Sequence, residues 1–512
     1  MVAKNVTWAH IKETSEEISH KIHPFFQKYG ILSTISYYLG ILLILLAFLL
    51  IIPTLTAYFW DNESMLALCF IYTALISGVA GAVLVFVSEK RELYLGAAIT
   101  LSALAWLVIG ILGGLPFWFA RNFYGPEWGL TFINSVFESM SGFTATGLNL
   151  YGMRVAELPY SILLWRSITQ WVGGVGVIVL FLSILVARTG TIAHKLYLAE
   201  GRDHRLVPSV VKTTRRIWAI YAGYTGLLAL ILIIVGMPIF DSINHSMTAL
   251  ATGGFSVQNF SIMNYRMAGH PNAFWIELAI MPFMVIGGIS FAMHYQLFLG
   301  NIKRFFSNIE VKAILIIILI STILLSVTFS LTFESFRYGS FQVITAITGT
   351  GFNTADVAAY TDFQKFILTI LMIFGGGYGS TASALKLLRV VIIFYSLIWI
   401  VKQYLLPESV VSKMNIGDKH YTPEAIQNVA VYIILYITLL VAGSMVFMYN
   451  GATAADSLFE VASAQGNVGL SVGLTGADMP LVEKITLIIV MWAGRLEIFP
   501  VLVFITSPFR KH

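Results

Sequence analysis

Charged residues and cysteine are scarce in this sequence. Asp, Glu, Lys and Arg make up 11% of the 512 residues, about half the share that is usual in soluble domains. The single cysteine, Cys69, excludes an internal disulfide and argues against a cysteine-ligated metal site. The net charge is only +5 and no basic arm or face is visible, so nucleic-acid binding is not expected. No cluster of candidate catalytic acids and bases or of metal-ligating residues is visible either, which argues against an enzyme.

Long apolar runs take the place of the missing charge. Hydrophobic residues make up 57% of the chain, and they form runs such as Ile41–Pro53 and Ile314–Leu325. Segments near 20 residues match the ~30 Å hydrocarbon core of a bilayer, and the chain holds about ten of them. Helices satisfy their own backbone polar groups in lipid, so the sequence predicts an all-α integral membrane protein. Residues 1–30 are amphipathic and charged without a signal-peptide pattern, which indicates a cytoplasmic interfacial arm.

The basic residues are distributed unevenly between the segments that join the spans. Of the 31 Lys and Arg residues, 23 fall in alternate segments: the N-terminal arm, the joints near residues 90, 187–216, 303–312 and 386–419, and the last three residues. Seven fall in the intervening segments, and Arg495 alone lies within a span. Because positive loops stay on the cytoplasmic side, we predict that both termini are cytoplasmic.

A fourfold internal repeat is the strongest pattern in the sequence. Four segments that read SGFTATGLN, TALATGGFS, TAITGTGFN and ASAQGNVGLS align on Gly147, Gly254, Gly351 and Gly469. Two positions after the glycine each repeat has a short polar residue: Asn149, Ser256, Asn353 and Ser471. Six positions before it each has a hydroxyl: Ser141, Thr248, Thr345 and Ser463. The glycines are 107, 97 and 118 residues apart, which suits a span, a short helix, a loop and a second span.

Each repeat is therefore predicted to contain two spans with a short helix and the glycine loop between them. The units cover residues 91–190, 191–300, 301–410 and 411–512, and residues 31–90 form an extra leading hairpin of two spans. Because every unit starts on the same side of the membrane, the four repeats are parallel. Thirteen positions before the glycines stand Asn134, Asp241 and Asp456, which we take as the N-caps of three short helices; the third repeat has Tyr338 there.

The glycine loops are predicted to line a central pore. A helix of about 12 residues cannot cross a ~30 Å core, and non-helical backbone at that depth is tolerated only where it is buried in protein or lines water. Four such loops around one axis would form a ring of carbonyls that replaces the hydration shell of a cation. The predicted filter residues are Thr146, Gly147, Gly253, Gly254, Thr350, Gly351, Val468 and Gly469. The carbonyls expected to bind the ion are those of Ala145, Thr146, Thr252, Gly253, Gly349, Thr350, Asn467 and Val468. For one loop a packing glycine would be the better interpretation, but four equivalent copies favour the filter.

A run of small residues interrupts the second span of the third unit. The sequence GGGYGSTAS contains Gly375, Gly376, Gly377, Gly379 and Ser380, and such a run should unwind a helix because each glycine costs about 1 kcal/mol relative to alanine. We predict a loop below the filter that gates the pore. A glycine-lined helix crossing is the alternative.

Arg495 is an ionisable residue deep in the last span, where such residues usually face a cavity or a partner. As part of the gate it would raise a barrier to cations or hydrogen-bond loop carbonyls near Gly377. A structural salt bridge is the alternative, although Glu497 at i+2 is poorly placed to be the partner.

Two further sets of residues recur at similar depth in the repeats. The pairs Gly173-Gly174 and Gly287-Gly288 in the second spans of the first two units are interpreted as packing contacts. Nine positions before the filter glycines stand Glu138, His245, Gln342 and Glu460. Hydrogen bonding behind the filter and ordinary helix polarity are both open for these four.

The four loops, the GGGYGSTAS break and the run GRLEIF at residues 494–499 together resemble the Trk/Ktr/HKT superfamily of potassium transporters, and the two leading spans resemble its TrkH branch. The resemblance covers the chain from about residue 31. It implies that the four glycines are filter glycines, that residues 375–383 form the gating loop and that Arg495 lies beside it. It also implies potassium as the substrate, no cofactor in this chain, a homodimer, and a cytosolic nucleotide-binding regulatory subunit of the Trk type. The location it implies is the plasma membrane of a bacterium or archaeon. The fourth loop departs from the pattern, because Val468 stands where two other loops have threonine.

Two mechanisms compete for this architecture. The first is channel-like potassium uptake driven by the membrane potential, and the second is a potassium symporter coupled to protons or sodium. Coupled transporters commonly place broken helices at the interface of inverted repeats. The repeats here are parallel, which favours the channel.

Overall fold

The computed structural model describes residues 30–61, 64–90, 93–184, 209–330, 332–407, 413–417 and 419–506. Most of the predicted N-terminal arm, the basic loop before residue 209 and the basic residues at the end of the chain lie outside this range. Within it, seven helices are long and apolar enough to cross a membrane, and two bent helix pairs bring the number to nine. The prediction of a helical membrane protein is confirmed. The structure adds one short hairpin of β1 (Met414–Ile416) and β2 (Lys419–Tyr421).

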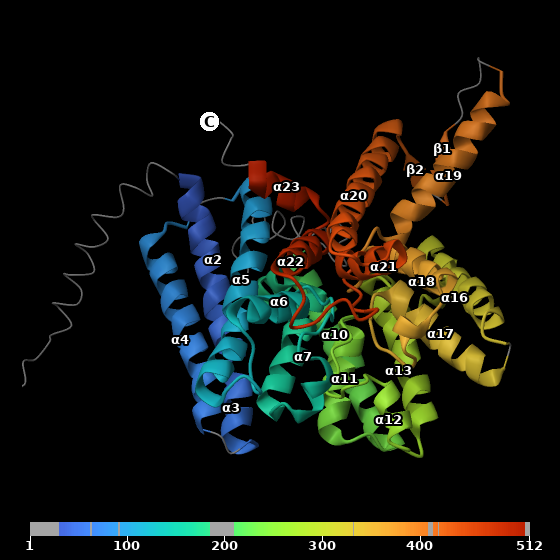
Figure 1. Cartoon of the computed structure of the whole chain (residues 1–512). Helices are drawn as coiled ribbons and strands as arrows, with labels where there is room; N and C mark the ends of the chain where they lie inside the picture. The colour runs from blue at the N-terminus through green and yellow to red at the C-terminus, as the bar shows by residue number, and fades with distance from the viewer. Residues whose placement is uncertain are drawn as a thin grey trace, which may run out of the picture.

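The leading hairpin packs beside the first repeat. It consists of α2 (Gly30–Leu49), α3 (Ile51–Phe59) and α4 (Ser64–Val87), of which α2 and α3 form one span. A Cβ added to Gly40 would lie 2.7 Å from Gly81 O, so α2 and α4 approach closely through small residues, as membrane helices commonly do. Figure 1 shows the hairpin on one side of the molecule, next to α5 (Leu95–Tyr124).

Each repeat begins with a long span followed by a short helix, as predicted. The first spans are α5, α10 (Val210–Val235), α16 (Ile309–Val327) and α20 (Pro423–Tyr449). The short helices are α6 (Phe132–Phe143), α11 (Ile239–Leu250), α17 (Phe333–Thr348) and α21 (Ala454–Gln465). A helix of 12 residues is about 18 Å long at 1.5 Å per residue, so α6, α11 and α21 are too short to cross a bilayer. The glycine loop follows each of them.

The N-caps predicted for the short helices are wrong. The helices α6, α11 and α21 begin two residues before Asn134, Asp241 and Asp456, so these residues occupy the third helical position. In α21 the cap is Thr453, whose hydroxyl accepts from Asp456 N. The third short helix, α17, begins at Phe333 and runs through Tyr338. Acidic residues are favourable throughout the first turn because of the helix dipole, so residue type alone did not locate the cap.

All four second spans are broken, whereas the sequence predicted a break only in the third. They are α7 (Tyr160–Val175) with α8 (Val177–Ile184), α13 (Ala273–Gly288) with α14 (Phe291–Phe298), α18 (Asp362–Phe374) with α19 (Leu387–Tyr404), and α22 (Leu481–Arg495) with α23 (Phe499–Thr506). The second and fourth pairs bend by 106° and 112°. The predicted packing role of Gly173 is confirmed, because a Cβ there would lie 1.8 Å from Phe143 O at the end of α6.

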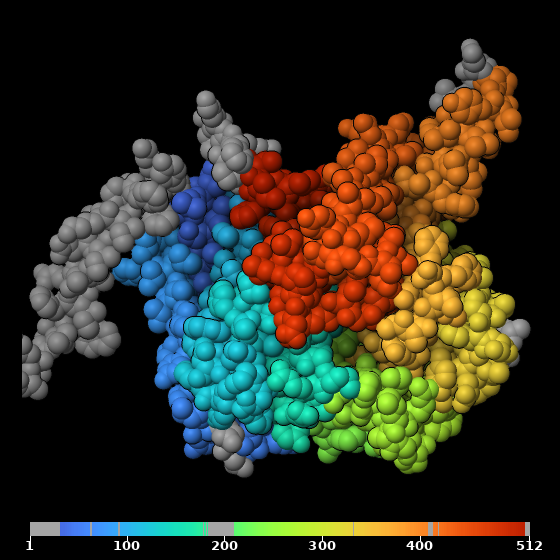
Figure 2. Space-filling model, in the orientation of Figure 1, coloured from blue at the N-terminus to red at the C-terminus, as the bar shows by residue number. Residues whose placement is uncertain are grey.

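The four repeats close into a ring. Each second span packs against the short helix of the next repeat: α7 against α11, α13 against α17, α18 against α21, and α22 against α6. Two of these joints carry ion pairs, Arg337 with Glu277 at 2.6 Å and Lys365 with Asp456 at 2.7 Å. In Figure 2 successive repeats occupy adjoining sectors, coloured cyan, green, yellow and orange-red. The predicted architecture of four parallel repeats and a leading hairpin is confirmed.

The remaining elements are short connections or project from the body. The helices η1 (Gly152–Glu157), α12 (Met263–Met267), α15 (Ile302–Ser307) and η2 (Val357–Ala359) join the longer ones. Helix α19 extends away from the ring (Figures 1 and 2), and Tyr404 near its end is 87% exposed. In Figure 1 the start of α2, the far end of α19 and helix α23 lie on the same side of the molecule.

Candidate ion pathway

The four glycines predicted to form the filter lie in one closed ring. A Cβ added to each glycine would overlap a carbonyl oxygen of the next repeat: Gly147 with Gly253 O at 2.1 Å, Gly254 with Thr350 O at 2.0 Å, Gly351 with Val468 O at 1.9 Å, and Gly469 with Thr146 O at 2.2 Å. The fourth loop thus returns to the first. No larger residue fits at these points, and the contacts bring together all eight predicted filter residues.

The four loops share one strained backbone conformation. Two positions before the glycine, Ala145, Thr252, Gly349 and Asn467 have φ values of 54°, 50°, 72° and 53°. The glycines themselves have φ values of 94°, 72°, 82° and 91°. A left-handed conformation costs a non-glycine residue about 1–2 kcal/mol, and strain of this kind clusters at functional sites. The sequence did not predict this conformation, because only the third loop has a glycine, Gly349, two positions before the ring glycine.

Gln170 on α7 fastens the second loop and was missed by the sequence analysis. Its Nε2 donates to Gly253 O at 2.6 Å, and its Oε1 accepts from Phe255 N at 2.9 Å. Gly253 O is one of the eight carbonyls expected to bind the ion. A carbonyl oxygen has two lone pairs, so the bond to Gln170 leaves one for another ligand. The residue carries no repeat signal that could have identified it.

Polar side chains of the short helices hold the loops from behind. Gly147 N donates to Ser141 Oγ at 3.1 Å, and Gly469 N donates to Ser463 Oγ at 3.0 Å. The four residues nine positions before the glycines all form hydrogen bonds with the segment that follows their loop. Glu138 accepts from Leu150 N, and Glu460 accepts from Val472 N. His245 contacts Ser256 Oγ, and Gln342 bonds the Ala355 backbone. Of the two interpretations left open for this set, the structure supports the hydrogen bonding, which joins each short helix to the segment after its glycine loop.

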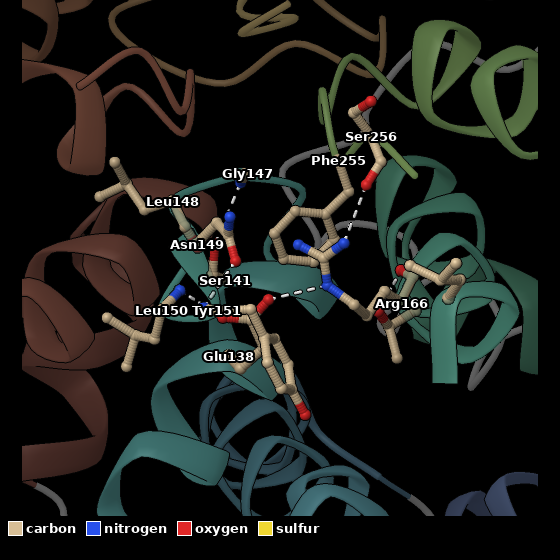
Figure 3. A network of polar contacts seen from close by, with 12 residues as sticks. Glu138, Ser141, Gly147, Leu148, Asn149, Leu150, Tyr151, Arg166, Phe255 and Ser256 are labelled. Atoms are coloured by element: carbon tan, nitrogen blue, oxygen red, sulfur yellow. Dashed lines mark hydrogen bonds and ion pairs between the residues drawn. The ribbon is translucent and has the colours of Figure 1, made fainter. Parts of the chain in front are cut away.

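Arg166 on α7 connects the first and second loops (Figure 3). Its Nε donates to Glu138 Oε1 at 2.9 Å, and its Nη1 donates to Ser256 O at 3.0 Å. The guanidinium carbon lies 4.1 Å from the centre of the Phe255 ring. Arg166 is only 2% exposed and Glu138 is fully buried, so the pair is desolvated and electrically neutral. In the sequence Arg166 falls among the seven basic residues predicted to lie outside the spans, whereas the structure places it inside α7.

A polar cavity of about 170 Å³ opens on one side of the glycine ring. All four ring glycines line it, together with Arg166 and the polar residues that follow each loop. None of residues 375–386, the segment predicted to gate the pore, lines this cavity.

The small residues predicted to form the gate lie in a non-helical loop, residues 375–386, next to the second glycine loop, and Arg495 lies at the end of α22. Gly377 N donates to Gly288 O at 2.8 Å, and Thr381 N donates to Gly287 O at 3.2 Å. Thr381 Oγ1 lies 3.0 Å from Leu250 O and 3.1 Å from Thr252 Oγ1. The alternative of a continuous helix crossing is therefore wrong, and the loop is attached to the second repeat.

Glu310 in the first turn of α16 holds the other side of this loop and was missed by the sequence analysis. Its Oε1 accepts from Tyr378 N at 2.7 Å. Within the loop, Ser380 Oγ donates to Gly377 O at 2.7 Å. Glu310 and Tyr378 are 68 positions apart, and no pattern in the sequence connects them.

Arg495 joins the loop at residues 375–386 to Gly174, close to the point where the second span of the first unit is broken. Its guanidinium donates to Thr381 O at 2.9 Å, to Ser383 Oγ at 3.1 Å and to Gly174 O at 2.7 Å. The predicted hydrogen bonding to the loop is confirmed, although the contacts lie at Thr381 and Ser383 rather than near Gly377. Glu497 pairs with Arg389 on α19, in agreement with its poor position relative to Arg495.

Comparisons with known proteins agree with this architecture. Residues 69–510 match the TrkH family, described as cation transport proteins. A cation transporter of Methanocaldococcus jannaschii is 32% identical over 93% of this chain and 96% of its own length. The Trk system potassium uptake protein TrkH of Salmonella typhimurium is 30% identical over 92% of this chain and 98% of its own. The crystal structure of the potassium transporter TrkH from Vibrio parahaemolyticus superimposes with a TM-score of 0.81 and 26% identity, covering 94% of this chain and 100% of that one. This chain is thus a multi-pass membrane protein that belongs to the TrkH family of cation transport proteins.

Proposed function

We propose that this protein takes up potassium through the four-loop ring and that the ring is its selectivity filter. The observation that carries the proposal is the closed contact between four equivalent loops, in which each glycine touches a carbonyl of the next repeat. Rings of backbone carbonyls can replace the hydration shell of a cation. Relatives named as potassium uptake proteins support potassium as the ion and a transporter rather than an enzyme. The chain needs no cofactor of its own for this role.

The loop at residues 375–386 is the proposed gate, with Arg495 as its latch. The loop is buried and interrupts a span beside the filter, and Arg495 holds it through Thr381 O and Ser383 Oγ. A guanidinium in a cation pathway also raises an electrostatic barrier. Opening would require the loop to release these bonds and move aside.

A symporter driven by protons or sodium is the second candidate, and the broken second spans are the feature that favours it. The parallel arrangement of the repeats favours the channel. For a channel the membrane potential alone supplies the driving force, about 2.3 kcal/mol per charge per 100 mV.

The resemblance supports a wider assembly, which we also propose. Two chains would form a homodimer in which each has its own pore, and a nucleotide-binding regulatory subunit of the Trk type would dock on the cytosolic side of the plasma membrane. The units proposed within each chain are a cytoplasmic arm (1–30), the leading hairpin (31–90) and four pore repeats (91–190, 191–300, 301–410 and 411–512). Both termini would be cytoplasmic.

The experiment that tests the function is cation flux into proteoliposomes of the purified protein. Potassium, rubidium, sodium and lithium are compared under a voltage set by an ionophore, with and without a proton or sodium gradient. We expect uptake that follows voltage alone, with potassium and rubidium ahead of sodium. Uptake that requires a proton or sodium gradient would establish the symporter, and uptake without preference among the four ions would remove the filter.

A further inference from the structure

The cavity on the outer side of the glycine ring is lined by an equivalent side chain from each repeat. These are the short polar residues two positions after the filter glycines: Asn149, Ser256, Asn353 and Ser471. Asn353 Oδ1 is buried and has no hydrogen-bond partner among the described residues. The fourfold repeat therefore places oxygen-bearing side chains around one space, directly outside the proposed filter.

The size of this cavity suits an ion that keeps part of its water. Its volume is about 170 Å³, and a water molecule occupies about 30 Å³ of the liquid. The space therefore has room for a monovalent cation with several of its waters. An ion held here would be one step from losing its hydration shell.

Glu460 supplies a negative charge next to this cavity. It is fully buried, and its carboxylate accepts hydrogen bonds from Ser471 Oγ at 2.7 Å, Val472 N at 3.0 Å and Thr475 N at 3.1 Å, with the Thr475 hydroxyl as a fourth donor. Four donors suit an ionised carboxylate. Ser471 and Thr475 also line the cavity, so Glu460 lies one side chain behind its wall.

The equivalent carboxylate of the first repeat differs from Glu460 in one respect. Glu138 is also fully buried, but Arg166 pairs with it at 2.9 Å and neutralises its charge. Among the described residues, no basic side chain forms an ion pair with Glu460. The third and second repeats have Gln342 and His245 at this position. The charge that Glu460 carries is thus the uncompensated one in this ring of four.

We propose that the cavity is a binding site for a partly hydrated monovalent cation, formed by the four polar side chains after the filter glycines and charged by Glu460. The proposal rests on the proposed function of cation conduction and deepens it. In a water-poor setting a buried charge acts on an ion with little screening. Glu460 thereby raises the local concentration of cations at the outer end of the filter.

The test measures the potassium concentration that gives half-maximal flux into proteoliposomes at low ionic strength. Glu460→Gln removes the charge and keeps the shape, and we expect this concentration to rise roughly tenfold. Glu460→Asp keeps the charge, so its half-maximal concentration should lie close to that of wild type.

The matched control is Asp456→Asn on the same helix, because Asp456 is 24% exposed and already paired with Lys365. This control should change the half-maximal concentration less than about twofold.

A second variant adds charge instead of removing it. Asn353→Asp should lower the half-maximal concentration severalfold, and it keeps the proposal testable if Glu460→Gln does not fold. The proposal is overturned if wild type conducts while neither variant changes this concentration. It is also overturned if Glu460→Asp is as impaired as Glu460→Gln, since that result points to packing. Voltage-driven flux of wild type is measured in the same vesicles, so a failure of the proposed function is seen separately.

Discussion

At the scale of single residues, the filter glycines satisfy two requirements at once. Gly351 has a φ of 82°, and a Cβ there would lie 1.9 Å from Val468 O. We therefore expect Gly351→Ala to cost about 1–2 kcal/mol for the backbone alone and to displace the fourth loop as well. The measurement is the ratio of potassium to sodium flux, which should fall at least about tenfold.

Gly476→Ala is the matched control for this substitution. Gly476 lies in the loop after the fourth filter segment, its φ is not positive, and a Cβ there would meet nothing within 4 Å. An unchanged flux ratio in Gly351→Ala, with the control also unchanged, would mean that the third loop does not select the ion.

Most of the residues that the sequence could identify are those that the repeat marks four times; Arg495 and the glycine run at residue 375 stand out because they are unusual within an apolar span. The filter glycines and the set at Glu138 were found because each occurs at one spacing in every unit. Gln170, Arg166 and Glu310 were not found, because each bonds a partner far away in the chain and has no equivalent that a spacing would mark. Contacts of this kind follow from the closure of the ring and cannot be derived from local pattern.

At the scale of elements, a small number of hydrogen bonds to the second repeat hold the loop at residues 375–386 in place. Thr381 Oγ1 lies 2.8 Å from Gly287 O and 3.0 Å from Leu250 O. Thr381→Val keeps the shape and removes this hydroxyl, which should cost about 1–2 kcal/mol of the closed arrangement. We expect potassium flux in the absence of any regulatory subunit to rise about five- to thirtyfold.

The control for this substitution is Thr369→Val on α18, whose hydroxyl donates only to Lys365 O one turn earlier in the same helix. Flux through this variant should equal that of wild type. If Thr381→Val folds normally and its basal flux is unchanged, the loop is not the gate.

Sequence predicted the elements better than their ends and bends. The long apolar spans, the short helices and the glycine-rich break at residue 375 were all found. The breaks after Val175 and Gly288 were missed, because a Gly-Gly pair in a membrane helix is equally typical of close packing. Here both hold, since Gly173 packs against Phe143 O and the helix ends two residues later.

At the scale of the whole molecule, a polar cavity opens at the glycine ring, and residues 375–386, which Arg495 hydrogen-bonds, do not line it. The excess of basic residues on alternate joints predicts which side faces the cytoplasm. Met153, in the segment after the first filter loop, is 54% exposed and should face outward; Tyr404 at the end of α19 is 87% exposed and should face inward. This orientation would make the polar cavity the entrance for uptake.

Cysteine labelling in intact cells tests this orientation. The native Cys69 is fully buried, so it can stay in place and wild type provides the unlabelled control. A membrane-impermeant maleimide should label Met153→Cys in intact cells, and it should label Tyr404→Cys only after the cells are permeabilised. The opposite pattern would place the basic joints outside, against the rule that orients membrane helices by their positive loops. The cavity charged by Glu460 would then lie at the exit of the pathway, where a bound cation would hinder release instead of promoting entry.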